Sequence, residues 1–515
     1  MKRIKLYLAC LLLTAAATLS SCELESELYS DISPATGYPS TAKDAEELLS
    51  SCYNVFSATE YADYFFSMGA GLWVLNWVIS DYGLVDRDDE KWLAMMYARW
   101  SPESANRSDV NNTWQHYRQL SKMELTIDRI KSIKMDETLK KQYIAELECA
   151  QGFVAFMLYD FYGPIPIADL ATLKDPAAMT ILPRKTEAEM EAYITGKLNS
   201  AAAVLPKSNA ETQHGRFTAG VAHTLLLKYY MQKRNWPEAV KEGRELQKPE
   251  YGYSLVKAGV NGYSPYASIF LEANEWNTEV IWASPLQKGL KEGKWLAYVL
   301  PGNYSTVDNC WRMWTAPWSF YDTFEDEDNR KATFAPEYVN KQGDTLTRAN
   351  PGTGSVWETL TNGPLTMKYP IETGTAAEAW FTDFIVYRYA DVLTLLAEAL
   401  VKNGTSYTEE PLSLLNEVVT RAGLTAYTTA DIPDKDKFIK VLLEERAKEL
   451  YWEGCRRQDL IRNDLFNKKM RAKATAAQEN TNIATDDPSE TKHYRLPFPA
   501  SLITESKGAV EQNPY

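Results

Sequence analysis

Histidine, cysteine and catalytic motifs are scarce in this chain of 515 residues, and each shortage removes a class of function. The 4 histidines show no metal-ligand spacing, and H-E-x-x-H does not occur. The 6 cysteines include no C-x-x-C pair, so a zinc ribbon or a thioredoxin-like site is unsupported. A G-x-S-x-G element and a glycine-rich phosphate loop are also missing. The sequence therefore carries no signature of metal, thiol or phosphate chemistry.

An excess of positive charge is missing as well. The formal net charge is −14, and losing the charges of Lys2, Arg3 and Lys5 with an N-terminal signal would take it from −14 to −17. Nucleic acids are bound by Lys and Arg side chains that displace counterions, so a polyanionic surface argues against nucleic acid. It argues equally against docking on anionic lipid head groups. It says little about neutral sugars, which meet no net-charge repulsion.

Long hydrophobic runs are absent too. The run Leu6–Ala17 holds about a dozen residues, fewer than the roughly 20 that span a bilayer. It follows a cationic start and precedes Leu19-Ser20-Ser21-Cys22, which resembles a bacterial lipobox. We expect residues 1–21 to be a lipoprotein signal peptide and Cys22 to carry the lipid that anchors the protein on a membrane. An ordinary secretory signal with a chance cysteine is the alternative.

Residues 22–40 read as a lipidated tether between the membrane and the folded body. They begin with the acidic segment Glu23–Leu28 and continue with Ser, Pro and Gly, a composition typical of flexible linkers. Four further cysteines lie far apart, and their spacing leaves open whether two of them join after export. They are Cys52, Cys149, Cys310 and Cys455.

Apolar residues recur at intervals of three and four in two groups of segments, which predicts amphipathic helices. The first group is 42–56, 111–133, 139–162, 187–205, 218–232 and 236–246. Gly163-Pro164 marks the end of the longest helix. The second group is 387–402, 411–422, 435–453 and a short stretch to Arg462.

Several of these helices form pairs joined by short turns, as in tetratricopeptide repeats. We therefore predict a mainly α fold, with a scaffold of tetratricopeptide-like helical pairs, long loop-rich insertions and a few short β-strands. The predicted single domain covers 41–515, with the scaffold at 41–250 and 384–515 and the loop-rich insertion at 251–383.

Five separated parts of the chain, in this order, resemble the SusD/RagB family. They are Ala145–Ile167, Gly215–Ala239, Tyr387–Leu393 with Arg421–Leu424, Glu445–Arg462, and Leu496–Pro499 with Gln512–Tyr515. The resemblance implies a SusD-like α-α superhelix in a lipoprotein on the surface of the outer membrane. It also implies a non-enzymatic module that binds glycans, without a cofactor, and delivers them to a SusC-like TonB-dependent transporter.

Two other functions remain open at this point. Some relatives are thought to bind peptides, so a RagB-like peptide-binding lipoprotein is one alternative. A glycoside hydrolase is the other and would need two carboxylates about 5–10 Å apart across a cleft. With 69 acidic residues the sequence does not exclude such a pair, but no motif points to one.

The charged residues of the family motifs are interpreted as scaffold. Glu445, Arg446 and Glu449 have helical spacing that favours ion pairs. Arg388 and Asp391 are expected to pair across one turn.

Aromatic residues gather in two irregular segments, 60–108 and 252–383, where loops on a rigid scaffold usually carry function. Indole and phenol rings can stack on the apolar face of a sugar. The predicted ligand-binding residues are Trp73, Asp81, Tyr82, Arg87, Trp92, Tyr298, Asn309, Trp311, Trp314, Trp318 and Tyr321. Among them, Trp311, Trp314 and Trp318 are expected to form an exposed platform. The alternative for each ring is a plug that covers the scaffold.

Some tryptophans are assigned to the core instead. Trp114, Trp236 and Trp452 lie on helix stripes, and Trp77 lies in an apolar run. The acidic run Glu325–Asn329 offers oxygen ligands for calcium but lacks EF-hand spacing, and a solvated loop is the simpler interpretation.

Overall fold

The computed structural model describes residues 37–59, 64–69, 71–87, 89–105, 114–175, 177, 180–209 and 213–515. The predicted signal peptide, Cys22 and most of the predicted tether lie outside these described residues. Within the described ranges, no helix is both long enough and apolar enough to cross a bilayer.

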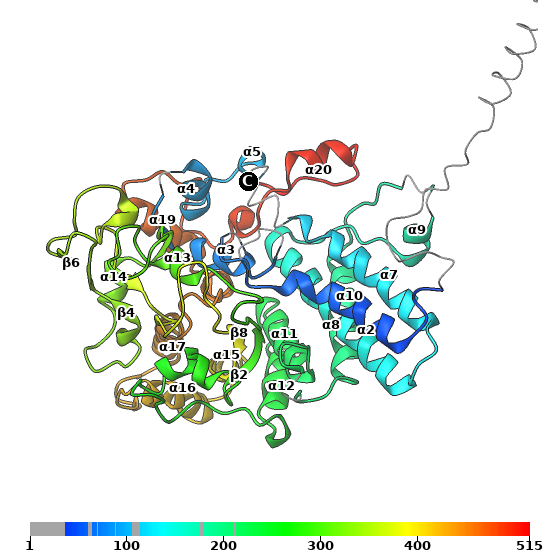
Figure 1. Cartoon of the computed structure of the whole chain (residues 1–515), viewed down its shortest axis with the longest axis horizontal. Coiled ribbons are helices and arrows are strands. Elements are labelled where there is room, and N and C mark those ends of the chain that lie inside the picture. The colour runs from blue at the N-terminus through cyan, green and yellow to red at the C-terminus, as the bar shows by residue number, and fades with distance from the viewer. Residues whose placement is uncertain are drawn as a thin grey trace, which may run out of the picture.

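The first helical group forms the right-hand side of the molecule in Figure 1. Helix α8 (Glu137–Tyr162) packs between α7 (Arg118–Ser132) and α10 (Glu187–Ala202). Helix α11 (Ala219–Gln232) packs against α10 and α12 (Trp236–Leu246). The periodicity therefore predicted these helices correctly, although residues 111–113 of one predicted helix lie outside the described ranges.

Local sequence signals fix several helix ends. Helix α2 (Ala42–Tyr53) begins with a capping box, in which the Thr41 side chain accepts from the Asp44 amide and the Asp44 carboxylate accepts from the Thr41 amide. Helix α8 ends at Gly163, whose φ of +74° is readily adopted only by glycine. The predicted stop at this residue is confirmed.

The second helical group follows strand β8 (Phe384–Arg388). Its helices are α15 (Tyr389–Lys402), α16 (Glu410–Arg421), α17 (Lys435–Glu449), α18 (Arg456–Arg462), α19 (Phe466–Ala476) and α20 (Ala500–Glu505). Helix α15 packs against α16, α17 and also α12, so the two groups make one continuous scaffold. The predicted mainly α fold is confirmed. Helices α19 and α20 were not predicted from the sequence.

Short elements and long connections build the loop-rich part, on the left of Figure 1. Its short helices are α3 (Leu72–Val78), α4 (Glu90–Met96), α5 (Pro102–Ala105), α13 (Trp295–Val299) and α14 (Trp318–Tyr321). The strand pairs are antiparallel: β1 (Leu84–Val85) with β3 (Trp314–Thr315), β2 (Val280–Ser284) with β8, β4 (Phe334–Ala335) with β7 (Leu365–Thr366), and β5 (Glu337–Val339) with β6 (Thr345–Thr347). Helix α9 (Leu170–Lys174) lies in the other half.

Tryptophan forms much of the core of this loop-rich part. The ring of Trp452 lies 5.7 Å from that of Trp73, 5.2 Å from Trp77 and 5.9 Å from Trp314. Trp295 adds a further edge-on contact at 6.5 Å. Segments with little regular structure have few aliphatic stripes to bury, and large aromatic side chains bury the most apolar area per residue. The indoles therefore hold the insertion onto the scaffold.

A buried network of charges joins the insertion to the second helical group. Arg388 donates to Glu279 at 2.7 Å and to Glu453 at 2.7 and 2.8 Å, and it also pairs with Glu449. Arg421 pairs with Glu279 and Glu449. Burial alone would raise the pKa of Glu449, but the guanidiniums, led by that of Arg421, outweigh it and hold the pKa at about 2. The Glu449 carboxylate is thus ionised at neutral pH.

A second buried set of ion pairs corrects one sequence expectation. Arg388 and Asp391 do not pair: Asp391 instead accepts from Lys228 at 2.9 Å and from Arg446 at 2.8 Å. Arg388 is the last residue of β8, whereas Asp391 lies in the first turn of α15. The i, i+3 rule holds only when both residues belong to one helix. The scaffold interpretation of Glu445, Arg446 and Glu449 fits their complete burial.

The structure shows the bonding state of the four remaining cysteines and of the acidic run Glu325–Asn329. Cys52, Cys149, Cys310 and Cys455 are free and buried, so no disulfide joins them in the structure.

The acidic run is ion-paired, through Glu325 with Lys448, Asp326 with Lys331, and Asp328 with Arg330. No group of three or more His, Cys, Asp and Glu side chains suited to a metal was found among the described residues. Calcium binding by this run stays a prediction.

Two carboxyl groups at the edge of the insertion have raised pKa values. Burial, followed by the charge of Asp383, raises the pKa of Glu275 to about 8, and burial raises that of Asp383 to about 6. Glu275 Oε1 accepts from the Asp383 amide at 2.7 Å. A neutral Glu275 is therefore the form that fits the folded protein at neutral pH.

We predict that Glu275→Gln becomes more stable relative to the wild type as pH rises from 5 to 8. An acid whose folded pKa lies above its unfolded value loses protons on unfolding, so its contribution to stability falls with pH between the two values. That window runs from 4.5 to about 8, and glutamine does not titrate in it. Thermal melts of both proteins at pH 5, 6, 7 and 8 measure the difference, which should reach a few degrees. A difference that is constant with pH would contradict the assignment.

Candidate glycan-binding surface

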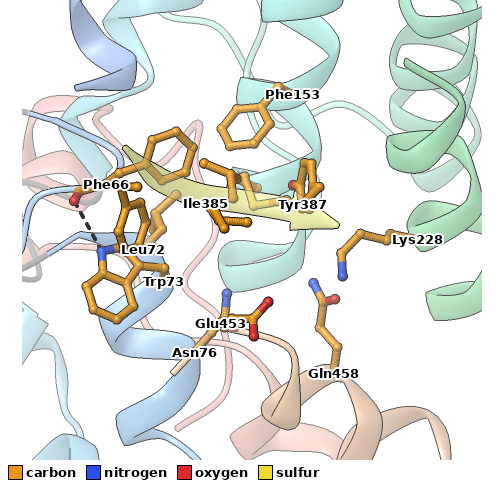
Figure 2. Close-up of a pocket in the computed structure, with 14 residues that line it drawn as sticks. Phe66, Leu72, Trp73, Asn76, Phe153, Lys228, Ile385, Tyr387, Glu453 and Gln458 are labelled. Atoms are coloured by element: carbon orange, nitrogen blue, oxygen red, sulfur yellow. Dashed lines mark hydrogen bonds between the residues drawn. The ribbon is translucent and has the colours of Figure 1, made fainter. Parts of the chain in front are cut away.

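The interior holds a small cavity between the scaffold and the insertion, shown in Figure 2. Phe66, Trp73 and Tyr387 line it together with the polar side chains of Lys228 and Glu453. Its volume of about 40 Å³ is far below the roughly 300–1,000 Å³ of small-molecule sites. The cavity is therefore part of the packing and does not take a sugar.

A better candidate is the surface around Trp311, on the segment that follows α13. The Trp311 amide donates to the Ala297 carbonyl at 2.9 Å, and the Met313 amide donates to the Tyr298 carbonyl at 2.7 Å. The next two residues form β3, which pairs with β1. Backbone hydrogen bonds on both sides thus fix the main chain at Trp311, whose indole is partly exposed.

Arg87 links Trp311 to a second partly exposed indole, Trp357. Its guanidinium donates to the carbonyl of Arg312 at 2.7 Å and to that of Trp311, and it lies 4.8 Å from the centre of the Trp357 ring. Trp357 lies in the 3-10 turn Val356–Glu358. The Glu358 carbonyl is held by the Tyr338 hydroxyl at 2.7 Å, so this turn is fixed as well.

The aromatic surface, as we call it, consists of Arg87, Lys294, Trp311 and Trp357, together with Asn309, which lies two residues before Trp311 in the chain. The Lys294 ammonium lies 5.8 Å from the Trp311 ring and pairs with Glu378 at 3.1 Å. Burial lowers the pKa of Arg87, but an arginine stays charged at neutral pH. Asn309 is exposed and has a φ of +59°. The surface thus combines two flat rings with cationic and amide donors.

Such a surface can bind a polyhydroxylated ring by stacking and hydrogen bonding. Aromatic faces carry a partial negative charge that attracts the polarised C–H groups of a sugar face. Side-chain donors beside the rings then set the orientation of the hydroxyls.

The predicted platform of Trp311, Trp314 and Trp318 is wrong in two of its three members. Trp314 is 0% exposed, and its indole N–H donates to the Met68 carbonyl at 2.7 Å. Trp318 is 9% exposed; its N–H donates to the Leu360 carbonyl at 2.8 Å, and Arg348 lies over its ring at 4.9 Å. Only Trp311 retains an accessible edge.

Three further predicted aromatic residues are buried. Trp73 donates to the Phe66 carbonyl at 3.2 Å, and Trp92 packs edge-on against Trp314 at 5.2 Å. Tyr298 supports the surface from below, edge-on to Trp311 at 5.5 Å and stacked on Trp314 at 5.8 Å. The rings of Trp73 and Trp92 therefore belong to the core, and direct stacking of a sugar on them is excluded in this structure.

Three more of the predicted ligand-binding residues, Asp81, Tyr82 and Tyr321, make contacts within the protein. Asp81 forms a bidentate ion pair with Arg456 at 2.8 Å. Burial alone would raise the pKa of Asp81, but Arg456 outweighs it, and the pKa is lowered. Tyr82 stacks on Phe320 at 4.3 Å, and Tyr321 packs edge-on against Trp318 at 5.7 Å. These residues stabilise the insertion. Of the predicted set, the structure brings Arg87 and Trp311 into contact, and Asn309 is exposed two residues before Trp311.

Sequence reasoning missed Trp357 and Lys294. Eleven of the 15 tryptophans are buried, and those partly exposed are Trp236, Trp276, Trp311 and Trp357. Trp357 follows Gly352 and Gly354, both with positive φ, and a turn of this kind is a weak signal for a surface ring.

Comparison with known proteins identifies relatives of this chain. Residues 266–515 match the model of the SusD family. A curated SusD-like protein of Formosa agariphila is 22% identical over 442 residues, which cover 80% of this chain and 80% of that protein. A second SusD-like protein from the same organism is 37% identical over 89 residues, 16% of this chain and 17% of that protein.

Solved structures share the fold along almost the whole chain. Surface glycan-binding protein A from Bacteroides thetaiotaomicron, in complex with laminarihexaose, superposes with a TM-score of 0.73 at 19% identity, over 92% of this chain and 100% of that chain. A SusD homologue from the same species gives a TM-score of 0.74 at 22% identity, over 93% and 97%. The motifs in order, the mainly α scaffold and these matches lead to one conclusion: residues 266–515 belong to the SusD/RagB family, and almost the whole chain has the SusD-like fold.

Proposed function

We propose that this protein captures glycans at the cell surface by stacking sugar rings on Trp311 and Trp357. The arrangement of these two partly exposed indoles around Arg87, on a rigid backbone, carries the proposal. Structural neighbours that bind glycans, among them surface glycan-binding protein A and a laminarin-binding SusD-like protein, support it. Binding takes place without covalent chemistry.

The proposed setting follows from the family and the N-terminus. The lipid on Cys22 would hold the protein on the outer membrane, and residues 22–40 would give the body reach. A SusC-like TonB-dependent transporter would receive the captured glycan. Modest affinity suits such a carrier, since each stacked ring adds about 1 kcal/mol and ordering the ligand offsets part of the gain.

Removing either ring should weaken glycan binding. We predict that Trp311→Ala and Trp357→Ala each reduce affinity about fivefold and that the double variant reduces it roughly 30-fold, because about 1 kcal/mol is lost per ring. Affinity electrophoresis in gels containing laminarin or other neutral polysaccharides identifies the ligand, and calorimetry with its oligosaccharides gives the affinities.

Trp236→Ala serves as the matched control, since Trp236 is also partly exposed but lies on α12 in the scaffold. It should bind like the wild type. If no polysaccharide retards the wild-type protein, or if the double variant binds as well as the control, the proposal is overturned. Release of reducing ends from any of these glycans would contradict a function limited to binding.

A further inference from the structure

A second site candidate lies between α2 and β2, on elements that contribute nothing to the aromatic surface. Two hollows of about 430 and 250 Å³ lie next to each other there and share His214 and Arg216 as lining residues. The larger one has the size of small-molecule sites, roughly 300–1,000 Å³. We call the two hollows together the His214 groove.

An aromatic pair marks the groove. The rings of His214 and Trp276 stack at 4.3 Å with an angle of 22° between them. The Trp276 N–H donates to Asp383 Oδ2 at 2.7 Å, which fixes the plane of the indole. The insertion has three partly exposed tryptophans: Trp311 and Trp357 on the aromatic surface, and Trp276 at this groove. The groove thus offers a ring on a fixed support.

Two polar atoms on the walls have no hydrogen-bond partner among the described residues. Ser284 is 2% exposed and lines the larger hollow, and its Oγ makes no hydrogen bond. Asn209 lines the smaller hollow; its Nδ2 donates to the Arg216 carbonyl at 2.9 Å, while its Oδ1 is unbonded. Buried polar groups in proteins are nearly always satisfied. Ligand hydroxyls would satisfy both atoms.

The larger hollow contains the charge of Lys291. Its ammonium forms no direct ion pair or hydrogen bond with the described residues, and the Asp383 carboxylate is the opposite charge that acts on it. Backbone hydrogen bonds with Gln287, at 2.7 and 2.9 Å, fix the position of Lys291. Burial lowers the pKa of Lys291, and the Asp383 carboxylate offsets only part of that shift, so a ligand carboxylate would further stabilise the ammonium. Arg216, by contrast, is neutralised by Glu146 at 2.6 and 2.9 Å.

We propose that the His214 groove is a second carbohydrate site and that it takes a sugar unit bearing a carboxylate, such as a uronic acid. The carboxylate pairs with Lys291, the hydroxyls bond to Ser284 Oγ and Asn209 Oδ1, and the sugar packs against the His214–Trp276 pair. This inference rests on the proposed glycan-binding function but concerns a different ligand class and different residues.

Calorimetry with galacturonate, glucuronate and mannuronate trisaccharides, and with their methyl esters, tests the assignment. We expect at least one acid to bind, and its ester to bind about tenfold more weakly, because a charge-assisted hydrogen bond is lost. Lys291→Met should weaken the acid about tenfold and remove the difference between acid and ester. Lys288→Met is the matched control, because Lys288 lies in the same hairpin but over the Phe381 ring at 5.2 Å.

The outcomes separate this site from the aromatic surface. Trp311→Ala should leave the binding of the acid unchanged. If no uronate binds, or if Lys291→Met with an unchanged melting temperature binds the acid like the wild type, the inference is overturned. If Trp311→Ala abolishes binding of the acid and Lys291→Met does not, the second site is overturned while the proposed function stands.

Discussion

Replacing Arg388 by methionine is expected to destabilise the protein by about 3–5 kcal/mol, because the change leaves buried carboxylates without their shared cation. Arg388 is 0% exposed and contacts Glu279, Glu449 and Glu453. Burial alone would lower its pKa, but these carboxylates raise it well above the usual value. Urea and thermal unfolding, followed by circular dichroism, measure the loss.

Arg348→Met is the matched control for this substitution. Arg348 also forms a bidentate pair, with Asp322 at 2.8 and 3.1 Å, but both side chains are about half exposed. Exposed pairs contribute about 0–1 kcal/mol, so the control should unfold close to the wild type. Equal stability of the two variants would show that the buried network is not needed for the fold.

Trp314→Ala should also destabilise the fold by about 3–5 kcal/mol, the range for truncating a large buried aromatic side chain. Its indole packs against Trp92 at 5.2 Å, Tyr298 at 5.8 Å and Trp452 at 5.9 Å, so the change leaves a cavity in the tryptophan core. Calorimetric melting of the purified variant gives the measurement.

Trp311→Ala, three residues earlier, provides the comparison with the same chemical change. Because its ring is partly exposed, stability should fall by about 1 kcal/mol or less, while glycan affinity falls. A Trp314→Ala protein that melts like Trp311→Ala would refute the division between core and surface rings. The pair of variants thus separates packing from binding within one short segment.

The helices could be predicted because their periodicity is a local property. Helices α8, α11, α12 and α15 begin and end within a few residues of the expected bounds. The short helices α3, α13 and α14 could not be found in this way, because 4 to 7 residues show too little of a period. Tertiary packing around the tryptophan core determines them.

The site was harder to predict because a loop tryptophan has the same sequence signal whether it is buried or exposed. Trp314 lies in β3 and is buried where this strand pairs with β1, whereas Trp311 precedes the strand and its amide bonds to the Ala297 carbonyl. Both contacts join residues far apart in the chain, so the local sequence does not show which indole is exposed. Trp357 and Trp276 were not predicted, because their exposure follows from distant contacts.

The buried charges also constrain how the chain acquires its structure. Arg388 and Glu279 are 109 residues apart in the sequence, and Arg421 and Glu279 are 142 apart. Contacts of such separation must close long loops, which slows folding relative to local helix pairing. An emerging polypeptide can form its early helical hairpins, but the insertion has to wait for Glu449. Completion of the insertion and assembly of the C-terminal helices should therefore occur as one late, concerted step.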